Sequence, residues 1–158
     1  MDIEIERLLT LLESPNNSQA YEALKALKEI SDRGNCLYPY MNKFIAMIDN
    51  NNSYIRTRGL TLIAYNAKWD TDDQINKIIG TYLEHITDEK PIYARQCIKL
   101  LPLIAKAKPV LISEIISALR NANVAQYADS MRPLVQNDIG ILCSHKEYKN
   151  TCVKDALY

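Results

Sequence analysis

Three side chains near the C-terminus could ligate a metal ion or act as nucleophiles. Cys143 and His145 are separated by one residue, and Cys152 follows seven positions later. Structural zinc sites usually take their ligands from two closely spaced pairs, whereas this segment contains one such pair. Cys36 is too far along the chain to be assigned as a fourth ligand. The sequence therefore predicts no metal site, and it indicates no cofactor.

Motifs for enzymatic chemistry are absent from the sequence. It contains no GxSxG, no HExxH, no Walker loop and no dinucleotide fingerprint, and it has two His and four scattered Gly. The acidic pairs at 72–73 and 88–89 are expected at the starts of helices, where carboxylates complement the positive end of the helix dipole. We therefore expect a protein that is not an enzyme.

The segment 54–70 is the richest in side chains suited to recognition. Arg58, Leu62, Tyr65 and Trp69 follow the i, i+4, i+7, i+11 spacing of one helical face. Tyr, Trp and Arg dominate the binding energy of protein interfaces, because they add a large area and directional bonds. The sequence predicts a partner-docking patch made of Tyr54, Arg56, Arg58, Tyr65, Trp69, Arg95 and Gln96.

A structural role for the same segment is the alternative. Trp69 would then fill the joint between successive helix pairs, while the arginines would pair with Asp70, Asp88 or Glu89 across that joint. A large loss of stability on replacing Arg58 or Trp69 would favour this structural role. The sequence leaves both interpretations open.

Composition excludes several classes of protein. The 158 residues are 47% hydrophobic and 24% charged, which fits one globular domain. Apolar runs are shorter than the roughly 18 residues of a membrane span, and the acidic start is unlike a signal peptide. Four scattered cysteines without CxxC spacing are typical of a reducing compartment. We expect a soluble cytoplasmic protein with no membrane association.

Charge is balanced overall but unevenly distributed. The formal net charge is zero, with −3 on residues 1–16, −1 on residues 17–90 and +4 on residues 91–158. Binding to nucleic-acid phosphates depends on several cations acting together. The mild basic bias of the last segment therefore argues against a nucleic-acid partner.

Apolar residues recur at intervals of three and four along the whole chain, and no sustained alternation of period two is present. This pattern predicts an all-helical protein. Ser18 is expected to cap one helix, Thr71 and Gln74 have the spacing of a capping box, and Pro39 is expected in an opening turn. The predicted helices are 3–13, 18–32, one beginning at Pro39, 55–68, 72–86, 92–107 and 109–121.

A repeat relates these helices to one another. A small residue followed by an apolar one recurs at Ala23, Gly59 and Cys97, in steps of 36 and 38 residues. The second helices repeat in steps of 34 and 37 residues. A unit of two amphipathic helices cannot bury its apolar face alone, so neighbouring units must stack.

The period, the helix pair and the motif NSYIRTRGLTLIA resemble HEAT-like repeats. Arg56 stands at the usual arginine position of that motif, whereas in the next unit Ala94 holds the position and Arg95 follows it. The resemblance implies a right-handed α-α superhelix of about three pairs over residues 18–123. We expect an N-terminal capping helix and a closing irregular helix pair from about 124 to 145, with Pro133 starting its second helix.

One domain is therefore expected over residues 1–145, followed by a flexible tail at 146–158. In arrays of this kind the second helices line the concave side. The residues expected to be exposed there are mixed in sign and contain few aromatics: Asn42, Lys43, Asn76, Lys77, Glu84, Ser113, Glu114, Ser117 and Arg120.

The sequence favours a non-catalytic scaffold or adaptor that binds another protein, and two alternatives come from resemblances. Stretches such as NSYIRTRGLTLIAYNAKWD resemble small clostridial-type proteins often called "SufBD protein", a name that implies an accessory role in iron–sulfur cluster assembly. Trp69 and Asp70 resemble the tryptophan and aspartate of HEAT-like DNA glycosylases of the AlkD type, which implies DNA binding. The single Trp and the neutral charge depart from that second pattern.

Overall fold

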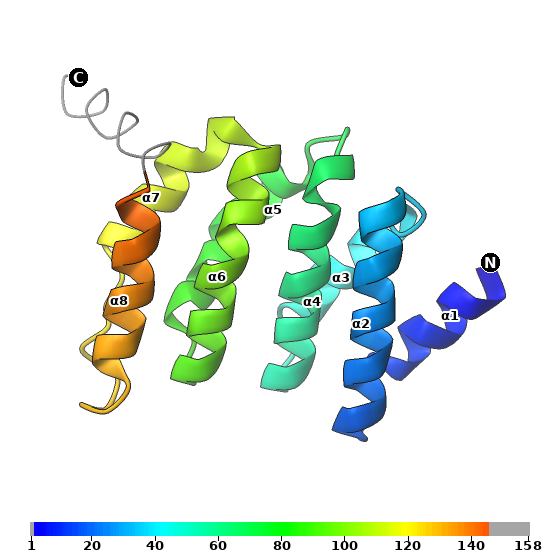
Figure 1. Ribbon diagram of the computed structural model, residues 1–158, viewed down its shortest axis with the longest axis horizontal. Coiled ribbons are helices and arrows are strands. Elements are labelled where there is room, and N and C mark those ends of the chain that lie inside the picture. Colours follow the sequence, from blue (N-terminus) through cyan, green and yellow to red (C-terminus); the bar gives the residue numbers. More distant parts are fainter. Residues whose placement is uncertain (1, 146–158) are drawn as a thin grey trace. The chain divides into compact units, whose positions relative to one another are not determined.

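The computed structural model describes residues 2–145, which form eight α-helices, four short 3-10 helices and no strand (Figure 1). The predicted all-α class is confirmed. The predicted tail at 146–158, which includes Cys152, lies outside the described residues. None of the helices within 2–145 combines the length and apolar character needed to cross a bilayer.

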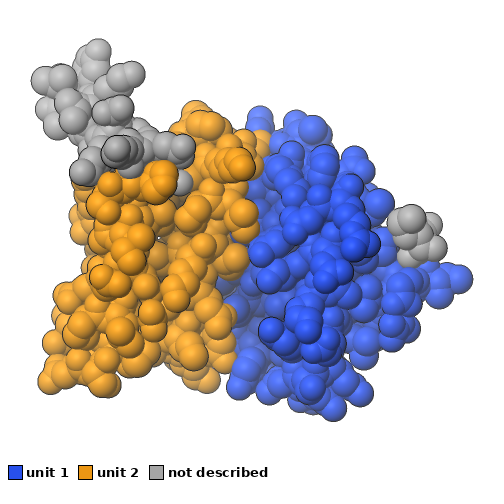
Figure 2. Space-filling model, in the orientation of Figure 1, with its two compact units in different colours: residues 1–75 blue, residues 76–158 orange. Residues whose placement is uncertain are grey.

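The chain divides into two compact units, residues 1–75 and residues 76–158 (Figure 2). Helix α5 begins at the end of the first unit and continues in the second. The first unit contains α1 (Asp2–Leu11), α2 (Asn17–Arg33), η1 (Tyr38–Tyr40), α3 (Met41–Met47), α4 (Ser53–Asn66) and η2 (Ala67–Trp69). The second contains most of α5 (Gln74–Glu84), then η3 (His85–Thr87), α6 (Pro91–Ala107), η4 (Pro109–Leu111), α7 (Ile112–Arg120) and α8 (Arg132–Cys143).

The starts of α2, α4 and α5 are capped by amide or carboxylate side chains, whereas α3 has no side-chain cap. Asn16 accepts hydrogen bonds from the backbone N–H groups of Ser18 and Gln19, so the predicted capping by Ser18 is wrong. Asn52 caps α4 in the same way. The side-chain oxygen satisfies N–H groups that have no partner within the helix.

Asp70 caps the start of α5. Its two carboxylate oxygens accept from the backbone N–H groups of Gln74 and Ile75, each at 3.0 Å. The predicted capping box of Thr71 and Gln74 is therefore wrong, because the Gln74 N–H donates to Asp70 and not to Thr71. Between cap and helix the chain turns through Asp73, whose φ of 54° is in the left-handed region.

Close packing of α3 against α4 depends on Gly59. A Cβ added at Gly59 would lie 2.8 Å from Met47 Cβ and 2.9 Å from the Phe44 carbonyl oxygen. Leu62 and Ile63 are fully buried in the same region. The absent side chain therefore allows the two helices to approach one another.

In the second unit α6 and α8 lie side by side and run in the same direction (Figure 1). The closing segment contains α8 alone, because residues 124–131 form turns, so the predicted closing helix pair over about 124–145 is wrong. Tyr127 lies in these turns, is buried, and donates its hydroxyl to the Asp88 carbonyl at 2.6 Å. Pro133 falls in the first turn of α8, as predicted.

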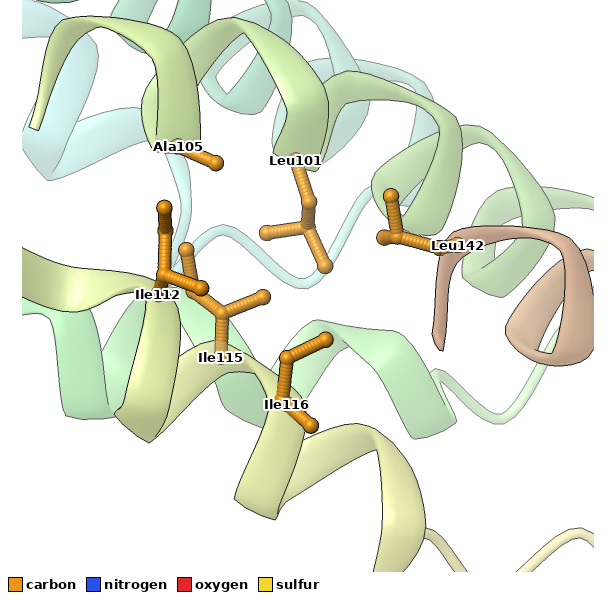
Figure 3. A pocket seen from close by; sticks show the side chains of 6 residues that line it. All are labelled: Leu101, Ala105, Ile112, Ile115, Ile116 and Leu142. Atoms are coloured by element: carbon orange, nitrogen blue, oxygen red, sulfur yellow. The ribbon is translucent and has the colours of Figure 1, made fainter. Parts of the chain in front are cut away.

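The core between α6, α7 and α8 is apolar and leaves no room for a water molecule. Six residues line the narrow gap between these helices (Figure 3): Leu101, Ala105, Ile112, Ile115, Ile116 and Leu142. A dry gap of this kind has no polar group to bind a ligand. We therefore regard it as part of the core.

Candidate interaction surfaces

The predicted docking row of α4 faces α1 and α2. Arg58 is buried and donates to the Leu12 carbonyl oxygen at 2.7 Å and to Asn17 Oδ1 at 3.1 Å. The Leu12 carbonyl follows the last turn of α1, where carbonyls lack intrahelical partners. Arg58 therefore joins α4 to the end of α1, and its side chain is not offered to a partner. The docking role predicted for Arg58 does not fit this placement.

The other members of the row contact α2. Trp69 Nε1 donates to the Ser31 carbonyl at 2.8 Å, and Lys28 Nζ lies 4.9 Å from the centre of the Tyr65 ring. Between them Asn66 Nδ2 donates to Ser31 Oγ at 3.0 Å. These contacts connect α2 with α4 and η2, and they favour the structural interpretation of Trp69 and Tyr65.

Tyr54 is the most exposed of the five predicted docking residues in the first unit, with 46% of its surface accessible. The Arg58 guanidinium carbon lies 5.7 Å from the centre of its ring. Arg56 is half-buried and donates to the carbonyl oxygens of Asn50 and Asn51, which closes the turn before α4. Tyr54 is therefore the residue of this group best placed for a partner.

Arg95 and Gln96 belong to α6 in the second unit. Arg95 Nε donates to Asp138 Oδ2 at 2.6 Å, and its second nitrogen lies 3.4 Å from Oδ1. The side chain of Asp138 is 6% exposed. The hydrogen bond to Asp138 raises the pKa of Arg95. The pair connects α6 to α8, whereas Gln96 is exposed.

A groove lies between α6 and α8, beside this ion pair. Its volume is about 210 Å³, and it is lined by Ile98, Lys99, Pro102, Asp138, Ile141 and Leu142. Ile141 is 63% exposed and adds apolar surface to the groove. This groove was not predicted from the sequence. Pro102, a proline in the interior of a predicted helix, is the signal that could have indicated it.

A second hollow, open and about 580 Å³ in volume, lies between α5 and α7. Three residues of the predicted concave surface line it, namely Ser113, Glu114 and Ser117, and small side chains keep it open. Lys77 and Arg120 are exposed outside it, and Asn76 is half-buried. Asn42 and Lys43 belong to α3 in the first unit, where Lys43 Nζ lies 4.0 Å from Glu13 Oε1.

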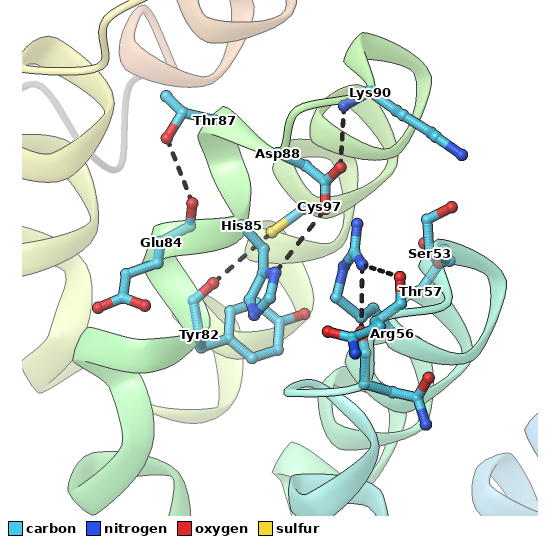
Figure 4. A network of polar contacts seen from close by, with 12 residues as sticks. Ser53, Arg56, Thr57, Tyr82, Glu84, His85, Thr87, Asp88, Lys90 and Cys97 are labelled. Atoms are coloured by element: carbon cyan, nitrogen blue, oxygen red, sulfur yellow. Dashed lines mark hydrogen bonds and ion pairs between the residues drawn. The ribbon is translucent and has the colours of Figure 1, made fainter.

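One cluster in the second unit contains the residue types of a cysteine–histidine–aspartate site (Figure 4). His85 Nδ1 lies 3.9 Å from Asp88 Oδ2, and the buried Cys97 Sγ lies 3.9 Å from the Tyr82 carbonyl. Burial raises the pKa of the Cys97 thiol far above its ordinary value, and burial also raises the pKa of Tyr82. A nucleophilic cysteine requires a lowered pKa and access. The geometry therefore makes Cys97 a packing residue.

Asp88 and Asp70 both act on backbone groups. Asp88 Oδ1 accepts from the Lys90 N–H at 3.0 Å, just before α6. Asp70 caps α5 and accepts from the Tyr38 hydroxyl at 2.8 Å. Trp69 and Asp70, which carried the resemblance to DNA glycosylases, are thus engaged in packing and capping. Within residues 2–145 no three His, Cys, Asp or Glu side chains gather as a metal site would require.

Comparison with protein-family models, with curated proteins and with solved structures finds no significant match to this chain. The functional conclusion therefore depends on the surfaces described above, among which the groove of α6 and α8 is lined mainly by apolar side chains.

Proposed function

We propose that the protein is a non-catalytic adaptor that binds another protein through the surface of stacked, HEAT-like helix pairs. A right-handed superhelix and a cytoplasmic location are parts of this proposal. Such a surface is rigid before binding, which lowers the entropic cost of association.

The burial of the repeat positions supports the HEAT-like part of the proposal. Ala23, Gly59 and Cys97 are all buried, as a shared register requires. The apolar residues four positions after each of them, Leu27, Ile63 and Leu101, are fully buried as well. Equivalent positions therefore have equivalent environments in three successive first helices.

The exposure of large aliphatic side chains on α6 and α8 is the observation that carries the binding function. Ile92 is 56% exposed, Leu103 38%, Leu134 40% and Ile141 63%. Exposed apolar side chains that gather on neighbouring elements mark surfaces that another molecule covers. The buried, protonated state of Cys97 supports the non-catalytic part, because it leaves the one cysteine–histidine–aspartate cluster of residues 2–145 without an activated nucleophile.

Affinity capture followed by reconstitution tests this function. The tagged full chain is incubated with lysate of the source organism, captured proteins are identified by mass spectrometry, and each is purified to measure its Kd with the wild-type chain. We expect at least one protein with a Kd of about 10 μM or tighter. Variants Tyr54→Glu and Ile92→Glu, each checked for folding, locate the binding surface in the first or second unit.

Two results would overturn the proposal. In one, no captured protein binds the purified chain. In the other, the purified chain turns over a substrate found in the lysate, and the turnover persists when binding is abolished.

A further inference from the structure

The strongest unassigned feature is the groove of α6 and α8, and its shape limits what can bind there. Ile98 is 1% exposed and Leu142 7% exposed, so these two form its floor, while Ile141 stands at its edge. The volume of about 210 Å³ lies below the roughly 300–1,000 Å³ of pockets that enclose small molecules. It can therefore take the ends of aliphatic side chains, but it cannot enclose a cofactor.

The charge around the groove is positive. The segments α6 and α8 together contain Arg95, Lys99, Lys106 and Arg132 but a single acid, Asp138. Arg95 engages that acid, and Arg132 pairs with Asp129 just before α8, so Lys99 and Lys106 supply the positive charge of this surface. Lys99 lines the groove, and Lys106 lies seven residues further along the same exposed face of α6. A partner that carries carboxylates beside its apolar side chains would match this distribution.

Pro102 provides an independent indication that the groove has a use. A proline within a helix cannot donate to the carbonyl four residues before it and costs about 3 kcal/mol. Here that carbonyl belongs to Ile98, and both residues line the groove. Proteins that break a local folding rule usually do so at functional sites.

We infer that the groove of α6 and α8 binds an amphipathic helix of a partner protein, with aliphatic side chains in the groove and acidic side chains against Lys99 and Lys106. This inference rests on the proposed adaptor function and names the chemistry of its partner. Two parallel helices leave a trough along their length, and a third helix fills it with residues spaced i, i+3, i+4 and i+7.

The test is a titration of the full chain with a designed probe. The probe is a fluorescent helical peptide of about 16 residues, roughly four turns, with leucines at i, i+3, i+4 and i+7 and glutamates on both flanks. A matched peptide has lysine at every glutamate position. We expect the acidic peptide to bind at about 50 mM salt, several-fold more weakly at about 200 mM, and at least about tenfold more tightly than the lysine peptide.

Matched variants locate the binding. Lys99→Glu and Ile141→Glu are each expected to weaken the acidic peptide about tenfold or more. The controls make the same changes outside the groove: Lys77→Glu on α5, and Val110→Glu, which replaces a side chain that is 76% exposed in the hollow of α5 and α7. We expect both controls to stay within about twofold of wild type. All four sites are exposed, and circular dichroism confirms folding.

Several results would overturn the inference. They are no binding of the acidic peptide at millimolar concentration, equal binding of both peptides, and loss of binding in Val110→Glu but not in Ile141→Glu.

Binding of the chain to anionic phosphatidylglycerol vesicles is measured as well. Vesicle binding that requires Ile141, without peptide binding, would assign the groove to a membrane surface. A captured protein partner combined with failure of the peptide would reject this inference and leave the adaptor function standing.

Discussion

At the scale of single residues, two glycines differ in the space around the position of a Cβ atom. Gly59 has Met47 and the Phe44 carbonyl within 3 Å of a Cβ position, whereas nothing lies within 4 Å of a Cβ at Gly80. The repeat pattern identified Gly59 as a small position, but it could not distinguish a tight contact from open space. That difference depends on how closely α3 approaches α4.

We predict that Gly59→Ala destabilises the fold by about 1–3 kcal/mol through overpacking. Gly80→Ala should stabilise it by about 0.5–1 kcal/mol, because alanine is the better helix former. Urea denaturation of both variants measures the two free energies. Equal shifts in the same direction would contradict the packing described for α3 and α4.

Burial of Cys97 and Tyr82 predicts a loss of stability in alkali. The folded state holds both groups neutral, while the unfolded chain releases their protons near the ordinary pKa values of 9.0 and 10.0. The unfolded state therefore binds fewer protons than the folded state above about pH 9, so the free energy of unfolding falls as pH rises. We expect Cys97→Ala to move the onset of this fall from near pH 9 to near pH 10. Denaturation series from pH 7 to 11 measure it, and identical profiles would refute this origin.

The stability of variants also tests the contacts that Arg58 and Trp69 make with the end of α1 and with α2. Arg58→Ala removes a donor from the Leu12 carbonyl and should cost about 1–3 kcal/mol. Trp69→Ala should cost at least about 2 kcal/mol. Tyr54→Ala, at an exposed position of α4, is the control and should leave the free energy of unfolding almost unchanged. If thermal unfolding shows that neither Arg58→Ala nor Trp69→Ala changes the stability, the docking interpretation of these two residues would be favoured instead.

At the scale of elements, the helices themselves were predictable, because apolar spacing reports the buried face wherever a helix packs. The caps were not. Asn16 and Asp70 act where Ser18 and Thr71 were predicted, since several adjacent residues can serve as caps and the exact end of a helix decides among them. The turns at 124–131 were also missed, because Tyr127 contributes its apolar ring to the core from a segment that is not helical.

Pro102 provides a testable prediction at the scale of elements. It is exposed within α6, so Pro102→Ala removes no buried contact and restores a backbone hydrogen bond to the Ile98 carbonyl. We expect the variant to be more stable by about 1–3 kcal/mol. Pro109→Ala, at the start of η4 where proline is favourable, should not be stabilised. Chemical denaturation compares the two, and a destabilised Pro102→Ala would show that the ring contributes to packing.

At the scale of the whole molecule, the net charge predicts how the protein behaves toward nucleic acid. The 19 basic and 19 acidic residues cancel, so no large positive field attracts a phosphate backbone. We expect a 20-base-pair DNA duplex to migrate freely in gel shifts at about 50 mM salt. Retention of the duplex that weakens steeply with salt would instead favour the DNA-binding alternative over the adaptor.

The sequence alone determined the all-helical class, the approximate bounds of the helices as far as residue 121 and the buried repeat positions, because these depend on local spacing and on the removal of apolar side chains from water. Only the tertiary structure decided which polar side chains remain available. Arg58 and Trp69 look like recognition residues in the sequence, yet the end of α1 and the Ser31 carbonyl already engage them. The groove of α6 and α8 depends on contacts between residues about 40 positions apart, such as Arg95 and Asp138, and no local pattern records such a contact.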